Sequence, residues 1–180
     1  MIYTACNNSN KGSNNLDIGN SKTQQKPNLI ELLIGNGNYF FRSVDLGTDF
    51  KTVLASEKKI PDENDTDDIT YTLPIDTLRP DSVNEAFDSA SYFTITYYFD
   101  KEKLNEADED IYLENDSIAA NLLGRLTSYL SSKYGDYASQ NDSRVWSTIR
   151  KGKKEWVTLS DQSEEYDNGK LLLVFYSEDY

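Results

Sequence analysis

The sequence contains no histidine, and this absence excludes several classes of catalytic site. Ser-His-Asp triads, Cys-His dyads and histidine-ligated zinc sites all require an imidazole. One cysteine cannot form a disulfide within the chain, and no stretch approaches the roughly 18 consecutive apolar residues of a membrane-spanning helix. Gly35-Asn36-Gly37 is too short for a phosphate-binding loop. We therefore expect a non-enzymatic protein that holds neither a cofactor nor a metal.

Positive charge is also scarce. The 18 Lys and Arg residues stand against 31 Asp and Glu residues, which leaves a formal net charge of −13. Nucleic-acid binding needs clustered Lys and Arg, because neutralised phosphates release their counterions. The charge balance therefore argues against a nucleic-acid partner, and it favours a protein partner of basic character or no partner.

Aromatic residues are plentiful by contrast, with 13 Tyr and 7 Phe among 180 residues. These side chains bury large areas, which compensates for a hydrophobic content of only 37%. After a polar N-terminal segment, a chain of about 150 residues can bury about two thirds of its unfolded surface around one core. We therefore expect residues 29–180 to form a single domain.

One long amphipathic helix is predicted between Asn115 and Gly135. Asn115 or Asp116 can accept the free amide protons of the first turn, and Gly135 suits the left-handed position after the last turn. Apolar residues recur every three or four positions and form one stripe that can lie on a sheet. The stripe consists of Ile118, Ala119, Leu122, Leu123, Leu126, Leu130 and Tyr134.

Alternating apolar and polar residues predict a set of antiparallel strands. The clearest is 92–100, and a tight turn after it leads to a return strand over 104–114. Turn residues at 151–152 and 168–169 separate the later strands. These further strands are predicted over 69–75, 144–150, 154–160 and 170–177.

Two shorter segments complete the predicted fold. Thr48 can cap a helix of about ten residues, and Leu29–Ile34 is a short strand or a single turn closed by the glycines that follow. The resulting order of helix, three strands, helix, three strands is a pseudo-duplicated α-βββ unit. It predicts an α+β two-layer sandwich, in which an antiparallel sheet of about six strands carries two helices on one face.

The sheet face that the helices leave uncovered is predicted to carry aromatic and acidic side chains. Tyr and Trp give large contact areas at low entropic cost, which is typical of a protein-recognition surface. Cross-strand aromatic pairs also stabilise the exposed side of a sheet, so this second interpretation stays open. The residues predicted on this face are Tyr92, Tyr98, Tyr112, Trp156, Asp108 and Asp110.

The position of the other tryptophan depends on the turn at Lys151-Gly152. A two-residue turn places Trp146 opposite Val157 and in the core, whereas a three-residue turn places it outside. We favour the core.

The acidic side chains allow a different class of function. Asp108, Asp110 and Glu114 share one strand face, and two carboxylates can catalyse glycoside hydrolysis. A calcium loop starting at Asp62 lacks the required glycine and the closing glutamate, so 61–68 is predicted as a solvated acidic loop. A hydrolase or a calcium-dependent carbohydrate binder is the alternative that these acidic residues leave open.

The segment Met1–Cys6, MIYTAC, places small residues directly before the cysteine, and the polar sequence NNSNKGSNN follows it. This pattern resembles the lipobox and linker of a Bacteroidetes-type envelope lipoprotein. The resemblance implies that Cys6 is lipidated, that residues 7–28 form a flexible tether, and that the membrane is contacted through the lipid anchor alone. No acidic cluster follows Cys6, which favours the periplasm-facing side of the cell envelope over surface exposure.

The pattern F-R-x-V-x-L-G-T-x-F-x-x-V runs from Phe41 to Val53. It resembles the opening of small bacterial lipoproteins with a β-lactamase-inhibitor-protein-like fold. The resemblance implies a helix that packs on an antiparallel meander, in a unit that is often present twice, and a concave sheet face that grips an enzyme. We therefore predict a non-enzymatic, lipid-anchored protein-binding module, with an immunity or inhibitor protein against a secreted toxin or enzyme as the alternative.

Overall fold

The computed structural model describes residues 29–35, 37–75 and 91–177. The predictions for Cys6 and for a tether over residues 7–28 concern residues outside this described part. The elements are α1 (Leu29–Ile34), α2 (Phe50–Ser56), β1 (Glu63–Asn64), β2 (Asp68–Pro74), β3 (Tyr92–Asp100), β4 (Lys103–Leu113), α3 (Asp116–Tyr134), β5 (Ala138–Gln140), β6 (Ser143–Arg150), β7 (Lys153–Asp161), the 3-10 helix η2 (Ser163–Glu165) and β8 (Gly169–Ser177). The strands form one antiparallel sheet in the order β1-β2-β3-β4-β8-β7-β6-β5.

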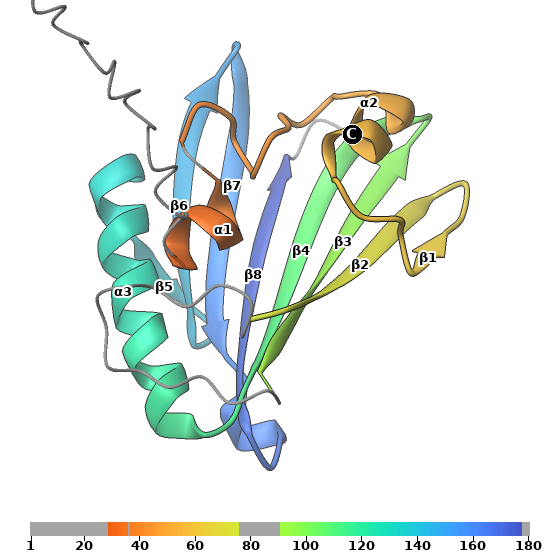
Figure 1. Ribbon diagram of the computed structural model, residues 1–180. Helices are drawn as coiled ribbons and strands as arrows, with labels where there is room; N and C mark the ends of the chain where they lie inside the picture. The colour runs from red at the N-terminus through yellow and green to blue at the C-terminus, as the bar shows by residue number, and fades with distance from the viewer. Residues whose placement is uncertain (1–28, 36, 76–90, 178–180) are drawn as a thin grey trace, which may run out of the picture.

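Each half of the described chain supplies a helix followed by a four-stranded meander. α2 precedes β1 to β4 and α3 precedes β5 to β8, and the last strands of the two meanders, β4 and β8, pair at the centre of the sheet (Figure 1). The α+β class and the antiparallel sheet are confirmed. The predicted counts of about six strands and two helices are wrong, because the described residues form eight strands and three α-helices.

The missed elements are short and lack the patterns that reveal longer ones. β1 pairs two residues with β2, and all three residues of β5 are exposed, so neither strand alternates between core and solvent. Both lie at the edges of the sheet, where short strands protect against pairing with other chains. α1 is a helix rather than a strand or single turn, and four of its six residues are buried.

The long helix α3 confirms the prediction for 115–135. The Asn115 side chain accepts a hydrogen bond from the Ile118 amide, and Gly135 follows the last turn with φ of 87°. The helix contacts β4, β8, β7 and β6. At Gly169 of β8 an added Cβ atom would lie 2.5 Å from the Asn115 carbonyl oxygen, so only glycine permits this approach between strand and helix.

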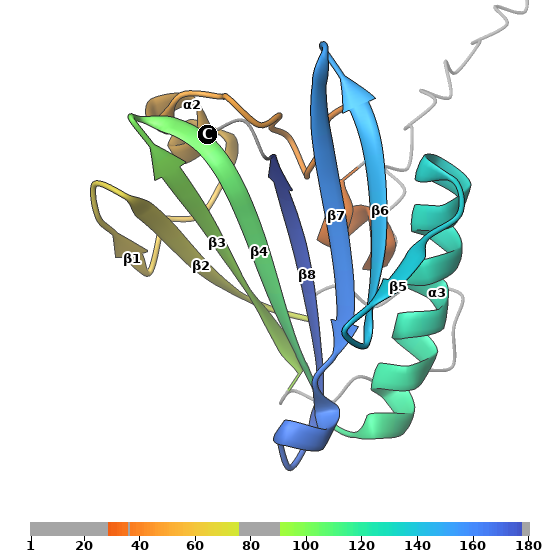
Figure 2. The ribbon, with the colours of Figure 1, turned by 180° about the vertical axis from the view of Figure 1, so that it is seen from behind.

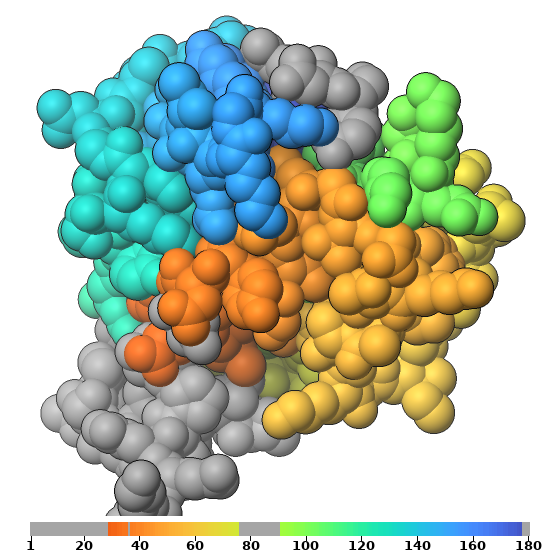
Figure 3. All heavy atoms as spheres, turned by 90° about the horizontal axis from the view of Figure 1, so that it is seen from above, coloured from red at the N-terminus to blue at the C-terminus, as the bar shows by residue number. Residues whose placement is uncertain are grey.

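The segment between α1 and α2 crosses one end of the sheet. Figure 3 shows this orange segment between the β6–β7 hairpin and the β3–β4 turn. The Gly47 amide donates to the Leu104 carbonyl at 2.7 Å, and the Leu104 amide donates to the Thr48 carbonyl at 2.9 Å. Thr48 is not the cap of α2, because Asp49 accepts the Thr52 amide instead and the Thr48 hydroxyl donates to the Asp45 carbonyl.

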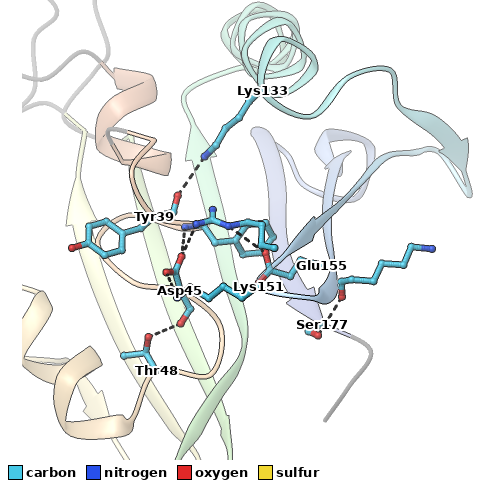
Figure 4. A network of polar contacts seen from close by, with 10 residues as sticks. Tyr39, Asp45, Thr48, Lys133, Lys151, Glu155 and Ser177 are labelled. Atoms are coloured by element: carbon cyan, nitrogen blue, oxygen red, sulfur yellow. Dashed lines mark hydrogen bonds and ion pairs between the residues drawn. The ribbon is translucent and has the colours of Figure 1, made fainter.

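Asp45 ties this crossing segment to the β6–β7 hairpin (Figure 4). Its two carboxylate oxygens accept hydrogen bonds from Arg150 Nη2 and from Lys151 Nζ, each at 2.9 Å. Arg150 Nε also lies 3.7 Å from Glu155 Oε2 on β7. These contacts join the crossing segment to the β6–β7 hairpin at one end of the sheet.

A second group of charged side chains lies on the helical side of the sheet, mostly shielded from solvent. Arg42 forms a two-pronged ion pair with Glu57, with Nε–Oε1 of 2.8 Å and Nη2–Oε2 of 3.1 Å, and Tyr97 donates its hydroxyl hydrogen to Glu57 at 2.6 Å. Glu109 of β4 is fully buried, and neither of its carboxylate oxygens has a hydrogen-bond partner. Burial raises the pKa of Glu109 well above its ordinary value. The nearby charge of Arg42 offsets this rise only in part.

Candidate functional site

The sheet face opposite the described helices carries the predicted recognition residues. α1, α2 and α3 all lie on one side of the sheet, and Figure 2 shows the other side with none of them in front of it. Along β3 the aliphatic and phenyl side chains are buried, whereas Tyr92 and Tyr98 are each 39% exposed. We call this side the open face.

Strand pairing arranges the predicted residues in rows across the open face. Tyr92 lies opposite Tyr112, and Tyr112 lies opposite Lys170. Thr94 lies opposite Asp110, and Thr96 lies opposite Asp108. The last row runs Tyr98, Glu106, Tyr176 and Trp156 across β3, β4, β8 and β7. All six residues predicted for this face therefore share it, although Tyr92 and Tyr112 lie several residues along the strands from Trp156.

Trp146 takes the opposite side, as predicted. Arg150 pairs with Lys153, so the hairpin turn contains two residues and Trp146 lies opposite Val157. The indole is buried, and its Nε1 donates to the Ser131 hydroxyl of α3 at 3.2 Å. The prediction for the core is confirmed.

Aromatic pairs stand at two corners of the open face. Tyr92 and Tyr112 stack with ring centroids 4.7 Å apart, and Tyr166 meets Tyr112 edge-on at 6.3 Å. At the other corner Trp156 and Tyr176 are nearly parallel, with centroids 6.4 Å apart. Tyr176 was missed, although its alternation with the buried Leu173 and Phe175 places it on this face.

At the corner formed by Tyr92, Tyr112 and Tyr166, the ammonium group of Lys170 contacts acidic and aromatic side chains. Lys170 Nζ lies 2.9 Å from Asp110 Oδ1 and 2.9 Å from the Tyr166 hydroxyl oxygen. It also lies 4.3 Å from the centroid of the Tyr166 ring and 5.2 Å from that of Tyr112. Burial would lower the pKa of Lys170, but the hydrogen bonds to Tyr166 and Asp110 raise it overall, so the ammonium group stays charged. A cleft of about 210 Å³ beside it is lined by Tyr92, Tyr112 and Tyr166.

Near Trp156 and Tyr176, the carboxyl groups of Glu106 and Asp108 lie close together on β4. Burial, followed by the nearby charges of Glu106 and Asp110, raises the pKa of Asp108 from 3.8 to about 7. Burial also raises the pKa of Glu106, although a hydrogen bond with Asp108 lowers this pKa in part. No lysine or arginine of the described residues forms an ion pair with either side chain. Asp108 Oδ1 has almost no solvent-accessible surface and no hydrogen-bond partner.

The acidic residues of the hydrolase alternative are divided between different environments. Asp110 is bound to Lys170, and Glu114 lies beyond the end of β4, next to the start of α3. At about 3.3 Å per strand residue, Asp110 and Glu114 are roughly 13 Å apart along the chain, beyond the spacing of about 5–9.5 Å that glycosidases use.

The predicted acidic loop over 61–68 contains the short strand β1 and ends on the first residue of β2, and its residues 62–67 are exposed. Asp62 uses its carboxylate within the protein, because both oxygens accept from Lys59 at 2.9 Å and one also accepts the Thr72 amide. Across the described residues, no group of three or more Asp, Glu or Cys side chains is arranged to hold a metal ion.

Comparison of the chain with protein-family models, with curated proteins and with solved structures gave no significant match. The resemblance to inhibitor-like envelope lipoproteins therefore stays a prediction. None of the helices in the described part of the chain is both long enough and apolar enough to cross a membrane.

Proposed function

We propose that this protein is a non-enzymatic, lipid-anchored component of the bacterial cell envelope that binds a protein partner on its open face. The observation that carries the proposal is the exposure of Tyr92 and Tyr98 on a face that no described helix covers. Large aromatic side chains at such positions contribute much of the binding energy of protein interfaces. The anchor rests on the lipobox-like sequence that ends at Cys6.

A narrower form of this proposal is an immunity or inhibitor protein that neutralises a toxin or enzyme. The net charge of −13 supports it, because opposite fields accelerate the encounter with a basic target. The helix-and-meander order, repeated in the two halves of the chain, suits the inhibitor-like resemblance.

We expect the double change Tyr98→Ala and Trp156→Ala to weaken capture of a partner from envelope extract by at least about tenfold. Truncating both rings removes contact area from one row of the open face, while the buried side of the sheet keeps its packing. The measurement is a quantitative pull-down with the purified domain, in which the captured proteins are identified by mass spectrometry.

Two other exposed tyrosines provide matched controls for this experiment. Tyr39 and Tyr137 are 44% and 41% exposed and lie outside the sheet strands. Tyr39→Ala and Tyr137→Ala are expected to retain capture. A partner that binds both the double variant and the wild type equally well would refute the open face as its binding site.

The lipid anchor has a separate test. When the protein is expressed from its own gene in a bacterium that matures lipoproteins, Cys6→Ser is expected to move it from the membrane fraction to the soluble fraction. The reason is that stable anchoring by acyl chains depends on the modified cysteine. Ser9→Ala, in the polar segment after the cysteine, is the control. Equal membrane association of the Cys6→Ser protein would contradict the anchor.

A further inference from the structure

A cleft at one end of the open face is lined by tyrosine rings together with polar side chains. It has a volume of about 210 Å³ and lies where β3 begins and β4 ends, next to the loop between η2 and β8 (Figure 2). Despite their ring contacts with Tyr112, Tyr92 and Tyr166 keep 39% and 45% of their surface exposed. We call this cleft the tyrosine cleft. Its aromatic and polar lining residues are Tyr92, Tyr112, Glu114, Tyr166, Asp167 and Asn168.

We propose that the tyrosine cleft binds one pyranose ring of a neutral carbohydrate. The C–H groups of the sugar ring lie against the tyrosine rings, because the negative face of an aromatic ring attracts weakly positive hydrogens. The sugar hydroxyl groups form hydrogen bonds with the polar side chains of the rim. This inference goes beyond the proposed function and does not depend on it, since Tyr92 lies about 20 Å along β3 from Tyr98.

The size of the cleft limits its occupant to about one ring. Sites for drug-sized ligands measure about 300–1,000 Å³, and the tyrosine cleft is smaller, at about 210 Å³. This volume holds roughly seven water molecules at about 30 Å³ each. A helix of a partner protein, with a diameter of about 10–12 Å, is too wide to enter it. The occupant is therefore a small molecule or the end of a chain.

The charges around the cleft favour a neutral ligand. Lys170 Nζ already lies 4.3 Å from the centroid of the Tyr166 ring and 5.2 Å from that of Tyr112, so a ligand cation would have to share these rings with an ammonium group. The carboxylates of Glu114 and Asp167 would repel an anion. A polyhydroxylated ring avoids both penalties, and its hydroxyl groups can donate hydrogen bonds to these carboxylates.

The walls of the cleft are held in place by contacts within the protein. The Tyr166 hydroxyl oxygen lies 2.9 Å from Lys170 Nζ, and the Tyr166 amide donates to the Ser163 carbonyl at 3.2 Å. Tyr92 and Tyr112 stack on paired strands, with ring centroids 4.7 Å apart. A ligand thus enters a site that is already formed, which reduces the entropic cost of binding.

The test is saturation-transfer difference NMR with the purified 180-residue chain. The probes are the methyl glycosides of glucose, galactose, mannose and N-acetylglucosamine. At least one of them is expected to bind with a dissociation constant of about 0.1–10 mM, because a single ring makes few contacts. Its ring C–H protons are expected to receive more saturation than its methyl group, since they face the tyrosine rings.

Substitutions locate the binding. Tyr92→Ala and Tyr166→Ala are each expected to weaken it at least about fivefold, whereas Tyr92→Phe keeps the ring and is expected to stay within about twofold of the wild type. The matched control is Tyr39→Ala, because Tyr39 is 44% exposed and lies outside the cleft. Thermal unfolding of each variant checks that the chain is folded.

Three outcomes would overturn the inference. The first is the absence of a signal from all four glycosides at about 20 mM. The second is weakening by Tyr39→Ala equal to that by Tyr92→Ala. The third is tighter binding of tetramethylammonium than of every glycoside, which would make the cleft a cation site.

The end of a glycan and a free monosaccharide share the same ring chemistry, and the reducing sugars distinguish them. Tighter binding of the methyl glycoside than of its reducing sugar indicates a glycan end, and the reverse indicates a free sugar; either result supports the cleft as a carbohydrate site. The double change Tyr98→Ala and Trp156→Ala separates the two proposals, because it is expected to weaken protein capture while the sugar still binds.

Discussion

Replacing Arg42 by methionine is expected to lower the free energy of unfolding by about 3–5 kcal/mol. The Arg42 and Glu57 side chains are only 13% and 10% exposed, and two hydrogen bonds of 2.8 and 3.1 Å join them. Arg42 Nη1 also donates to the Leu32 carbonyl, so the side chain links α1 to the segment after α2. Without Arg42, the buried carboxylate of Glu57 keeps only the Tyr97 hydroxyl as a partner.

A paired replacement separates the charge effect from lost packing. Because methionine and leucine can fill the space left by a buried ion pair, Arg42→Met combined with Glu57→Leu is expected to recover most of the loss. The measurement is urea unfolding at pH 7, compared with Lys59→Met, which removes a half-exposed cation from a surface ion pair. A loss below about 1 kcal/mol for Arg42→Met would contradict a structural role of the pair.

The free energy of unfolding is expected to be about 2–4 kcal/mol higher at pH 5 than at pH 8. Burial raises the pKa values of Glu109, Asp108 and Glu155 in the folded state, for Asp108 from 3.8 to about 7. A carboxyl with a raised pKa binds its proton more tightly when folded than when unfolded. Its contribution to stability is therefore complete below its unfolded pKa and is lost as the pH rises through its folded pKa.

Two carboxylates act in the opposite direction and limit the gain at low pH. Burial would raise the pKa of Glu57, but hydrogen bonding and charge attraction by Arg42 lower it overall, and Asp45 is lowered similarly by Lys151 and Arg150. Their stabilising effect is present above their unfolded pKa values of about 4 and is lost only below them. The stability maximum is therefore expected near pH 5 rather than at neutral pH.

Single substitutions test which carboxyl groups cause this pH dependence of stability. Glu109→Gln and Asp108→Asn are each expected to reduce the difference between pH 5 and pH 8, because neither amide titrates. Glu164→Gln, exposed in η2, is expected to keep the wild-type difference. Urea unfolding at several pH values measures it, and equal or greater stability at pH 8 than at pH 5 would show that the buried carboxyls are stabilised by partners when ionised.

Much of the open face could be predicted because a strand has a side-chain period of two. Once Phe93, Ile95 and Tyr97 were assigned to the core, Tyr92 and Tyr98 had to face the other way, and the structure agrees. The return strand gives Asp108, Asp110 and Tyr112 the same side by the same rule. Such alternation is local, so it needs no knowledge of which strands pair.

Other features depend on pairing between distant parts of the chain and have no local signal. Tyr166 and Lys170 come together with Asp110 because β8 lies beside β4, more than 50 residues away in sequence. Glu109 is an exception to the expectation that charged residues are exposed. It lies two residues from both Ala107 and Ile111, so strand alternation places its side chain on the buried face. Its burial next to the Arg42–Glu57 pair follows only from the way residues 37–57 fold over the sheet.

The order of amino acids was thus sufficient for the α+β class, for the long helix with both its ends and for the faces of the central strands, because capping and periodicity act within a few residues. The three-dimensional arrangement alone decided that the sheet has eight strands joined through β4 and β8, that Lys170 is enclosed by tyrosines, and that Glu106 and Asp108 lack a cation among the described residues. The physical reason is that charge, burial and ring contacts depend on distances in space, which chain position does not specify when strands from the two halves meet.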